Sequence, residues 1–216
     1  MSEQRAASAE KIGARLRQLR TEAGMSLRSV AETIGISSSA LSQIEKGVMQ
    51  PSVNRLIEIV SVFGVPVSAI FDDNDVLRPV PLEGGQTTEP IPGITVSSVG
   101  AGSETVLGQG VVYKRLTPVR VEGVDLYETV YPPLTSSSID GAMLVHSGFD
   151  VGHVISGTLR FEFTEGTVEL GPGGSLSFWA SRPHRVVNES PDEPATAIWL
   201  TLRNTPQAPG GAEFGH

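Results

Sequence analysis

The chain contains no cysteine, which excludes disulfides, thiolate metal sites and a cysteine nucleophile. It has no run approaching the ~20 apolar residues that a membrane helix needs, and its first residues lack the charged-then-apolar layout of a secretion signal. There is also no serine-nucleophile signature and no glycine loop of the kind that cradles phosphates. We therefore expect a cytoplasmic protein without membrane partners and outside the common hydrolase and nucleotide-binding classes.

Positive charge is also in short supply, because the 216 residues carry a net charge of -8. An acidic chain has little nonspecific affinity for nucleic acid. The charge is uneven, however, since residues 1–50 contain seven Lys/Arg against five Asp/Glu. A locally basic face on an acidic protein is compatible with DNA binding.

Composition changes along the chain in a way that predicts two domains. The first part has few glycines and prolines and spaces its apolar residues at helical intervals, whereas the last part contains short runs of β-branched and aromatic residues separated by turn residues. Many short strands without helices between them suggest a sandwich or barrel. The predicted boundaries are 8–72 for a helical domain, 73–92 for a linker, 93–204 for a β domain and 205–216 for a flexible tail.

Serine caps and glycine stops divide the helical domain into five short helices. We predict them over residues 8–22, 27–34, 38–46 and 53–63, with a last short turn over 67–71. The connection Gly35-Ile36-Ser37 joins the second and third of these helices and has only three residues. Such a turn sets two helices at a steep angle and leaves the second protruding, so that it can enter a major groove of DNA.

The residues of this domain resemble the Xre or phage-repressor type of helix-turn-helix, a lambda-repressor-like all-α fold. The resemblance is carried by Leu16-Arg17, Leu19-Arg20, Gly24, Ser26-Leu27, Val30-Ala31, Ile34-Gly35-Ile36-Ser37, Leu41-Ser42, Ile44-Glu45-Lys46-Gly47, Pro51-Ser52 and Leu56. It implies base contacts from Ser38, Ser39, Ser42 and Gln43, and phosphate contacts from Arg28, Ser52, Asn54 and Arg55. It also implies a buried ion pair between Arg20 and Glu45.

Blander interpretations of the same residues remain open. Ser37 and Ser52 precede helices and are expected to cap them whatever else they do. Arg28 is equally compatible with a solvated surface residue. For the domain as a whole, the alternative to DNA binding is a small helical protein-interaction module.

In the β domain, strands are predicted at residues 111–113, 126–131, 158–163, 175–179 and 197–202. Two motifs follow, over residues 146–159 and 170–188, and they contain the turn residues Gly157 and Pro172-Gly173. The first motif contains His146 and the second contains His184. This region resembles the cupin, an all-β jelly-roll barrel, and specifically the cupin sensor domain found behind Xre-type domains.

The cupin resemblance implies a site for a divalent metal such as Zn, Fe or Mn, held by His146, Asp150 and His184. In metal-binding cupins the first motif has two histidines and a glutamate, whereas here Leu144 stands at the first histidine position and Asp150 at the glutamate position. Two imidazoles and a carboxylate can hold such a metal with open positions. The alternative is a polar pocket in which the histidines bind an organic ligand or each other.

A barrel of this size can enclose one small ligand. We expect an effector pocket lined by His146, Asp150, His153, His184, Tyr127 and Trp199.

Together these features predict a homodimeric, sequence-specific regulator that binds double-stranded DNA and a small-molecule effector, and that is not an enzyme. One short helix buries too little surface for tight operator binding, which is why a dimer is expected. The alternative is a metal-dependent cupin enzyme with an appended helical domain, although Leu144 weakens its metal site. The identity of the effector, the operator and the sign of regulation are not encoded in any pattern of the sequence.

Overall fold

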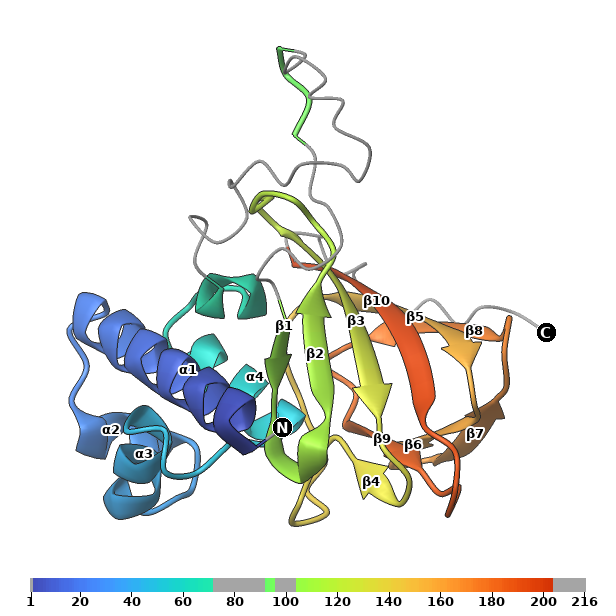
Figure 1. Cartoon of the computed structure of the whole chain (residues 1–216), viewed down its shortest axis with the longest axis horizontal. Coiled ribbons are helices and arrows are strands. Elements are labelled where there is room, and N and C mark those ends of the chain that lie inside the picture. Colours follow the sequence, from blue (N-terminus) through green and yellow to red (C-terminus); the bar gives the residue numbers. More distant parts are fainter. Residues whose placement is uncertain (1, 72–91, 96–103, 204–216) are drawn as a thin grey trace.

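A helical domain and a β-barrel lie side by side in the computed structural model, which describes residues 2–71, 92–95 and 104–203 (Figure 1). The predicted linker over 73–92 lies almost entirely outside the described residues, and the predicted tail over 205–216 lies wholly outside them. Among the described residues, no helix is both long enough and apolar enough to cross a bilayer.

The helical domain contains four α-helices, and the fifth predicted helix is a 3-10 turn. Their bounds are α1 Ser2–Glu22, α2 Leu27–Thr33, α3 Ser38–Glu45 and α4 Val53–Val62, followed by the turn η1 Val67–Ile70. The first helix begins six residues earlier than Ser8, where it was predicted to start. Residues 2–7 contain neither glycine nor proline, so nothing in their composition stops a helix.

Serine caps start α2, α3 and α4, as predicted. The hydroxyl oxygens of Ser26, Ser37 and Ser52 accept hydrogen bonds from backbone N–H groups three residues further on, at 3.0, 3.1 and 3.2 Å. Gly35 ends α2 with a φ of +68°, in the left-handed region that favours glycine. These local signals end α2 and start α3, and so define the short turn between the two helices.

The ion pair implied for Arg20 and Glu45 is present and joins α1 to α3. Arg20 Nε donates to Glu45 Oε1 at 2.6 Å and Nη2 donates to Oε2 at 3.0 Å, while Nη1 donates to the carbonyl of Met25 at 2.9 Å. The Glu45 side chain is 4% exposed. Its role is therefore structural, because it fixes the C-terminal end of α3 against α1.

Replacing Glu45 with glutamine should lower the free energy of unfolding by about 2 kcal/mol, since it leaves the Arg20 charge buried without a counter-ion. The matched control is Glu32→Gln, which breaks the exposed Arg28–Glu32 pair and should change stability by less than about 0.5 kcal/mol. Urea denaturation of both variants measures the difference. Equal stabilities for the two variants would contradict a structural role for the buried pair.

The barrel is built from two antiparallel sheets. The strands are β1 Glu104–Val106, β2 Val112–Arg115, β3 Val124–Tyr131, β4 Thr135–Ser136, β5 Phe149–Ser156, β6 Leu159–Phe163, β7 Gly166–Leu170, β8 Ser175–Trp179, β9 His184–Asn188 and β10 Ala195–Leu202. One sheet has the order β1-β2-β3-β10-β5-β8 and the other has the order β4-β9-β6-β7. This is the predicted all-β jelly roll, and each of the five predicted strands overlaps an observed one.

Residues alternate strictly along the central strands between the barrel interior and its outer face. In β3, Asp125, Tyr127, Thr129 and Tyr131 are buried while their neighbours are half-exposed. In β10, Trp199 and Thr201 point inward in the same way. The interior of the barrel is therefore lined by both aromatic and polar groups, which is the setting for a binding site.

Candidate functional site

Helix α3 has two distinct faces. Leu41 and Ile44 are buried against α1 and α2, whereas Ser39 and Gln43 lie one turn apart on the solvent side and are exposed. Ser38 and Ser42 are half-buried beside them. The solvent side of α3 therefore carries the polar residues that were predicted to contact bases.

The four residues expected to contact phosphates lie in three different environments. Arg28 is exposed and pairs only with Glu32, at 2.8 Å. Arg55 is half-buried, donating to the carbonyl of Ile34 at 2.8 Å and to Glu58 at 2.7 Å. Ser52 and Asn54 are 8% and 4% exposed.

Asn54 requires a correction, because in this structure it faces the barrel and cannot reach a phosphate. Its Nδ2 donates to the carbonyl of Ala142 at 3.0 Å, and its backbone N–H donates to the carbonyl of Ser137 at 2.9 Å. The sequence gives no sign of these contacts, since the partners are more than eighty residues away along the chain. Asn54 therefore belongs to the contact between the two domains.

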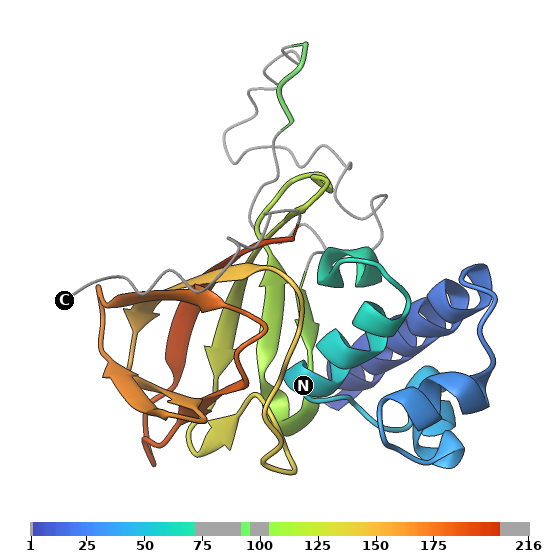
Figure 2. The ribbon, with the colours of Figure 1, turned by 180° about the vertical axis from the view of Figure 1, so that it is seen from behind.

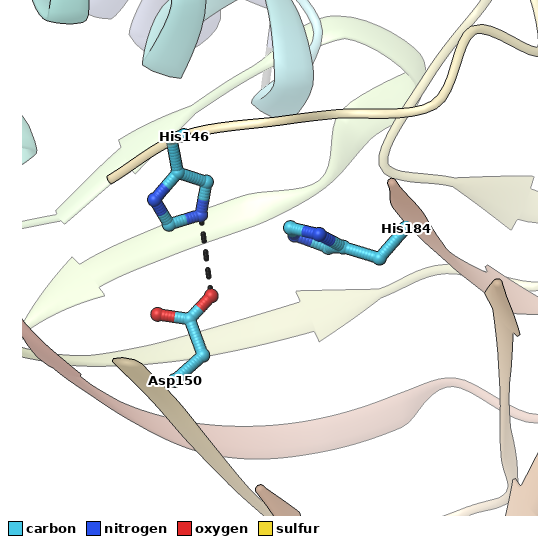
Figure 3. A group of neighbouring side chains, drawn as sticks. All are labelled: His146, Asp150 and His184. Atoms are coloured by element: carbon cyan, nitrogen blue, oxygen red, sulfur yellow. Dashed lines mark ion pairs between the residues drawn. The ribbon is translucent and has the colours of Figure 1, made fainter. Parts of the chain in front are cut away.

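Inside the barrel, His146, Asp150 and His184 converge from three segments, as Figure 3 shows. His146 lies just before β5, Asp150 lies within β5, and His184 is the first residue of β9 in the opposite sheet. All three are buried, and their ligand atoms lie within 4.8 Å of one another. Predicted from the cupin resemblance as one site, these three residues are brought together by the fold.

The hydrogen bonds of the two histidines determine which nitrogens face the site. His184 Nδ1 lies 2.8 Å from the carbonyl oxygen of Arg182, and His146 Nδ1 lies 3.1 Å from that of Ser147. A carbonyl oxygen only accepts, so each Nδ1 carries the proton. His184 Nε2 is then left to offer a lone pair. Histidines that bind metals are oriented by the same kind of bond.

His146 Nε2 lies 3.2 Å from Asp150 Oδ2 (Figure 3). With Nδ1 facing the carbonyl of Ser147, Nε2 faces the carboxylate, and a cation bound here would contact both atoms. Asp150 Oδ1 accepts a hydrogen bond from Thr201 at 2.7 Å, which fixes the carboxylate.

The ionisation of His184 and Asp150 favours metal binding. Burial lowers the pKa of His184, so this imidazole is neutral at pH 7. Burial alone would raise the pKa of Asp150, but hydrogen bonds from His146 and Thr201 and the charge of His146 lower it below the ordinary carboxyl value. Asp150 is therefore a carboxylate, and the two imidazoles and the carboxylate together suit a divalent metal.

Leu144 supplies no fourth donor. It is 3% exposed, and its backbone N–H and carbonyl pair with those of His184 at 2.8 and 3.0 Å. The side chain lines the cavity beside the histidines. Leu144 thus makes one side of the site apolar and leaves the metal, if bound, with open positions.

Of the other residues predicted for the pocket, Tyr127 and Trp199 line the cavity, but His153 does not. His153 is half-buried on the outer face of β5, where its Nδ1 and the Ser175 hydroxyl lie 2.7 Å apart. The reason is strand alternation: Asp150 points inward, and a residue three positions along the same strand must point outward. The prediction for His153 was therefore wrong.

The cavity also includes residues that the sequence did not indicate. Its lining comprises Val53, Asn54, Ile57, Tyr127, Thr129, Tyr131, Ser137, Leu144, His146, Asp150, His184, Val186 and Trp199. The first three belong to α4 of the helical domain. Apolar residues on α4 look like ordinary core positions in the sequence, so only the packing of the two domains reveals this second role.

Comparison with known proteins supports the identification of a helix-turn-helix domain and of a cupin domain in this chain. A helix-turn-helix family model matches residues 16–70, and a cupin domain model matches residues 131–201. The chain is similar to the HTH-type transcriptional regulator PuuR of Escherichia coli strain K12, being 27% identical over 182 residues that cover 82% of this chain and 88% of PuuR.

Two further comparisons bear on the domains and the fold. The chain is 37% identical over 65 residues to the HTH-type transcriptional regulator SinR of Bacillus licheniformis, covering 30% of this chain and 59% of SinR. The crystal structure of an HTH_3 family transcriptional regulator from Vibrio cholerae superimposes with a TM-score of 0.66 at 20% identity, covering 93% of this chain and 99% of that one. That structure shows the same fold over both domains.

Proposed function

The chain joins an Xre-type helix-turn-helix domain to a cupin domain, and from this premise we propose that it is a sequence-specific DNA-binding transcriptional regulator whose barrel binds a small effector. The observation that carries the DNA-binding half is α3, whose buried face is locked to α1 by Arg20 and Glu45 while Ser39 and Gln43 are exposed. The curated relatives with which the chain aligns are named as transcriptional regulators.

In this proposal the residues of α3 read bases and the arginines around it position the domain. Gln43 pairs with adenine through its amide, which can donate and accept at once, while the hydroxyls of Ser38, Ser39 and Ser42 are less selective. Arg28 and Arg55 bind phosphates. The protein acts as a homodimer whose two α3 helices meet half-sites about 34 Å apart.

We further propose that His146, Asp150 and His184 hold a divalent Zn, Fe or Mn ion. The fit rests on three buried donors whose ligand atoms lie within 4.8 Å of one another. Once bound, the metal would offer open coordination positions to an oxygen or nitrogen of the effector. Without a metal, the His146–Asp150 pair makes the same cavity a polar site for an organic ligand.

Metal binding should weaken as the pH falls through the pKa of His184, which burial places below the ordinary histidine value of about 6.5. The lowered pKa of His184 keeps this imidazole neutral at pH 7, so binding is undiminished there. At lower pH protons compete for the same lone pair, and affinity should fall by up to about tenfold per pH unit for each imidazole that must lose a proton. Zinc titrations by calorimetry at pH 7.5 and 5.5 measure this; equal affinities at the two values would contradict histidine ligation.

The experiment that tests DNA binding is selection of duplexes from a random pool, followed by a gel shift with the enriched sequence. We expect a defined sequence to be enriched and bound in preference to scrambled duplexes of the same length. A protein that binds all duplexes alike, or none, does not have the proposed function.

A metal-dependent cupin enzyme is the second candidate, favoured by the same three donors. The two candidates differ in what the metal does. For a regulator, protein purified without chelators and loaded with iron should consume no oxygen on small organic substrates. Stoichiometric iron with substrate-dependent oxygen consumption would instead favour the enzyme.

A further inference from the structure

One wall of the cavity in the barrel is formed by the helical domain. Val53, Asn54 and Ile57 of α4 form one wall, and the barrel residues around His146 and Asp150 form the rest. Figure 2 shows α4 beside α1, on the side of the helical domain that faces the barrel. The proposed effector site is thus shared between the two domains.

The shared cavity is small in this arrangement. Its volume is about 20 Å³, which is room for about one water molecule or a metal ion. Pockets that enclose organic ligands have roughly 300–1,000 Å³. A larger organic effector therefore needs the walls of the cavity to move apart, and α4 is the wall that belongs to the helical domain.

Specific contacts hold α4 in this position. Asn54 donates from its backbone to Ser137 and from its side chain to Ala142, as described above. Arg55 Nη2 lies 3.3 Å from Asp140 Oδ2, and the Gly108 N–H donates to the carbonyl of Pro51 at 2.8 Å. These contacts all involve the start of α4 or the residue before its cap.

A second contact lies at the other end of the helical domain. Phe71 follows η1 and stacks on Tyr113, with ring centroids 6.1 Å apart. Tyr113 stacks on Tyr127 at 4.4 Å, and Tyr127 on Trp199 at 6.5 Å. Tyr127 and Trp199 line the cavity, so this row of rings runs from the site to the end of the helical domain.

We propose that an organic effector and the docked helix α4 exclude each other, so that effector binding releases the DNA-binding domain from the barrel. Docking buries Ser52 and engages Arg55 with Asp140, and both were expected to contact phosphates. Docking and DNA binding therefore compete for the same residues. The docked form is the one with low DNA affinity, and the effector raises that affinity. This inference rests on the proposed function, because it needs a DNA-binding helix-turn-helix.

A single thiol can report whether α4 is docked, since the chain has no cysteine of its own. Ser137→Cys places the thiol on the barrel side of the contact, at a position that is 3% exposed. Ala180→Cys, at a position that is 0% exposed and does not line the cavity, is the control. A buried thiol reacts only when its surroundings open.

The labelling rate with an aromatic disulfide reagent is measured with and without a saturating selected duplex. The duplex should accelerate labelling of the Ser137→Cys variant roughly tenfold and leave the Ala180→Cys variant unchanged. Labelling that is unchanged or slowed by a bound duplex overturns the inference and leaves the proposed function standing. Failure to bind any selected duplex counts against the proposed function instead.

A substitution that fills the cavity with a larger side chain should have the same effect on α4 as the unidentified effector. Val186 lines the cavity from β9, and Val186→Phe adds a ring where there is room for about one water. In the Ser137→Cys background this variant should label faster than Val186→Ala, which only enlarges the cavity. Equal rates in two folded variants overturn the mutual exclusion of occupant and helix.

The coupling to DNA is tested without touching either the cavity or α4. Asp140 and Glu165 have side chains 58% and 60% exposed and each pairs with an arginine, but only Asp140 pairs with α4. Both Asp140→Ala and Glu165→Ala remove one negative charge. Asp140→Ala should bind the selected duplex about two- to fivefold more tightly than Glu165→Ala, and an equal or weaker affinity overturns the competition between docking and DNA.

Discussion

Replacement of both Ser39 and Gln43 by alanine should weaken binding to the selected duplex roughly 100-fold, because a well-placed bidentate base contact contributes about 1–3 kcal/mol and hydroxyl contacts add to it. Both side chains are exposed on α3 and make no contact with the core, so the variant should fold normally. The measurement is fluorescence anisotropy against the selected duplex and against one with altered half-sites. Unchanged affinity and unchanged base preference would show that α3 does not read DNA.

Arg28→Ala provides the matched comparison, since Arg28 is also exposed but is assigned to phosphate. A lost phosphate contact weakens binding to all sequences alike and lowers the salt dependence by about one counterion. Base preference should therefore survive in Arg28→Ala and disappear in the double alanine variant. If Arg28→Ala loses base preference as the double alanine variant does, Arg28 does not act only on phosphate, and the proposed assignment of roles is wrong.

His184→Ala should reduce affinity for zinc more than about 100-fold, beyond the 10–100-fold range observed when only a hydrogen-bond partner of a metal ligand is removed. The variant takes away one of only three donors, and Leu144 cannot replace it. Metal analysis after dialysis should show bound metal falling from one equivalent to background.

His153→Ala is the control for this prediction, because His153 lies on the outer face of β5 and should not affect metal content. If His184→Ala and His153→Ala retain metal equally, the three-donor site is not where the metal binds. If the unaltered protein holds no zinc at all, the three residues form a polar pocket and not a zinc site.

Local features of this fold were predictable because they depend on residues near one another in the sequence. Ser37 caps α3 through a hydrogen bond to a residue three positions away. Gly35 adopts a left-handed backbone conformation, which depends on glycine itself and not on a distant partner. The convergence of His146, Asp150 and His184 was also predicted, but through resemblance to a barrel whose topology brings two distant motifs together.

The predictions that were wrong concern the face of a strand on which a side chain lies, or contacts between residues distant in the sequence. The prediction that His153 lines the pocket was wrong because side chains alternate along a strand, and the sequence motif did not place His153 on the correct face of β5. Asn54 was not recognised as a wall of the cavity because its partner, Ala142, lies 88 residues away and is contacted only through its backbone. No composition or periodicity distinguishes a helix start that faces DNA from one that faces a second domain.

Selection of duplexes from a random pool, carried out in parallel with the unaltered protein and the Ser39→Ala, Gln43→Ala double variant, tests most directly whether α3 reads base sequence. The unaltered protein should enrich a motif with two half-sites spaced about 34 Å apart, one for each subunit of a dimer, and the variant should enrich none. The same motif enriched by both proteins, or no motif by either, would contradict a regulator that recognises its operator through this helix.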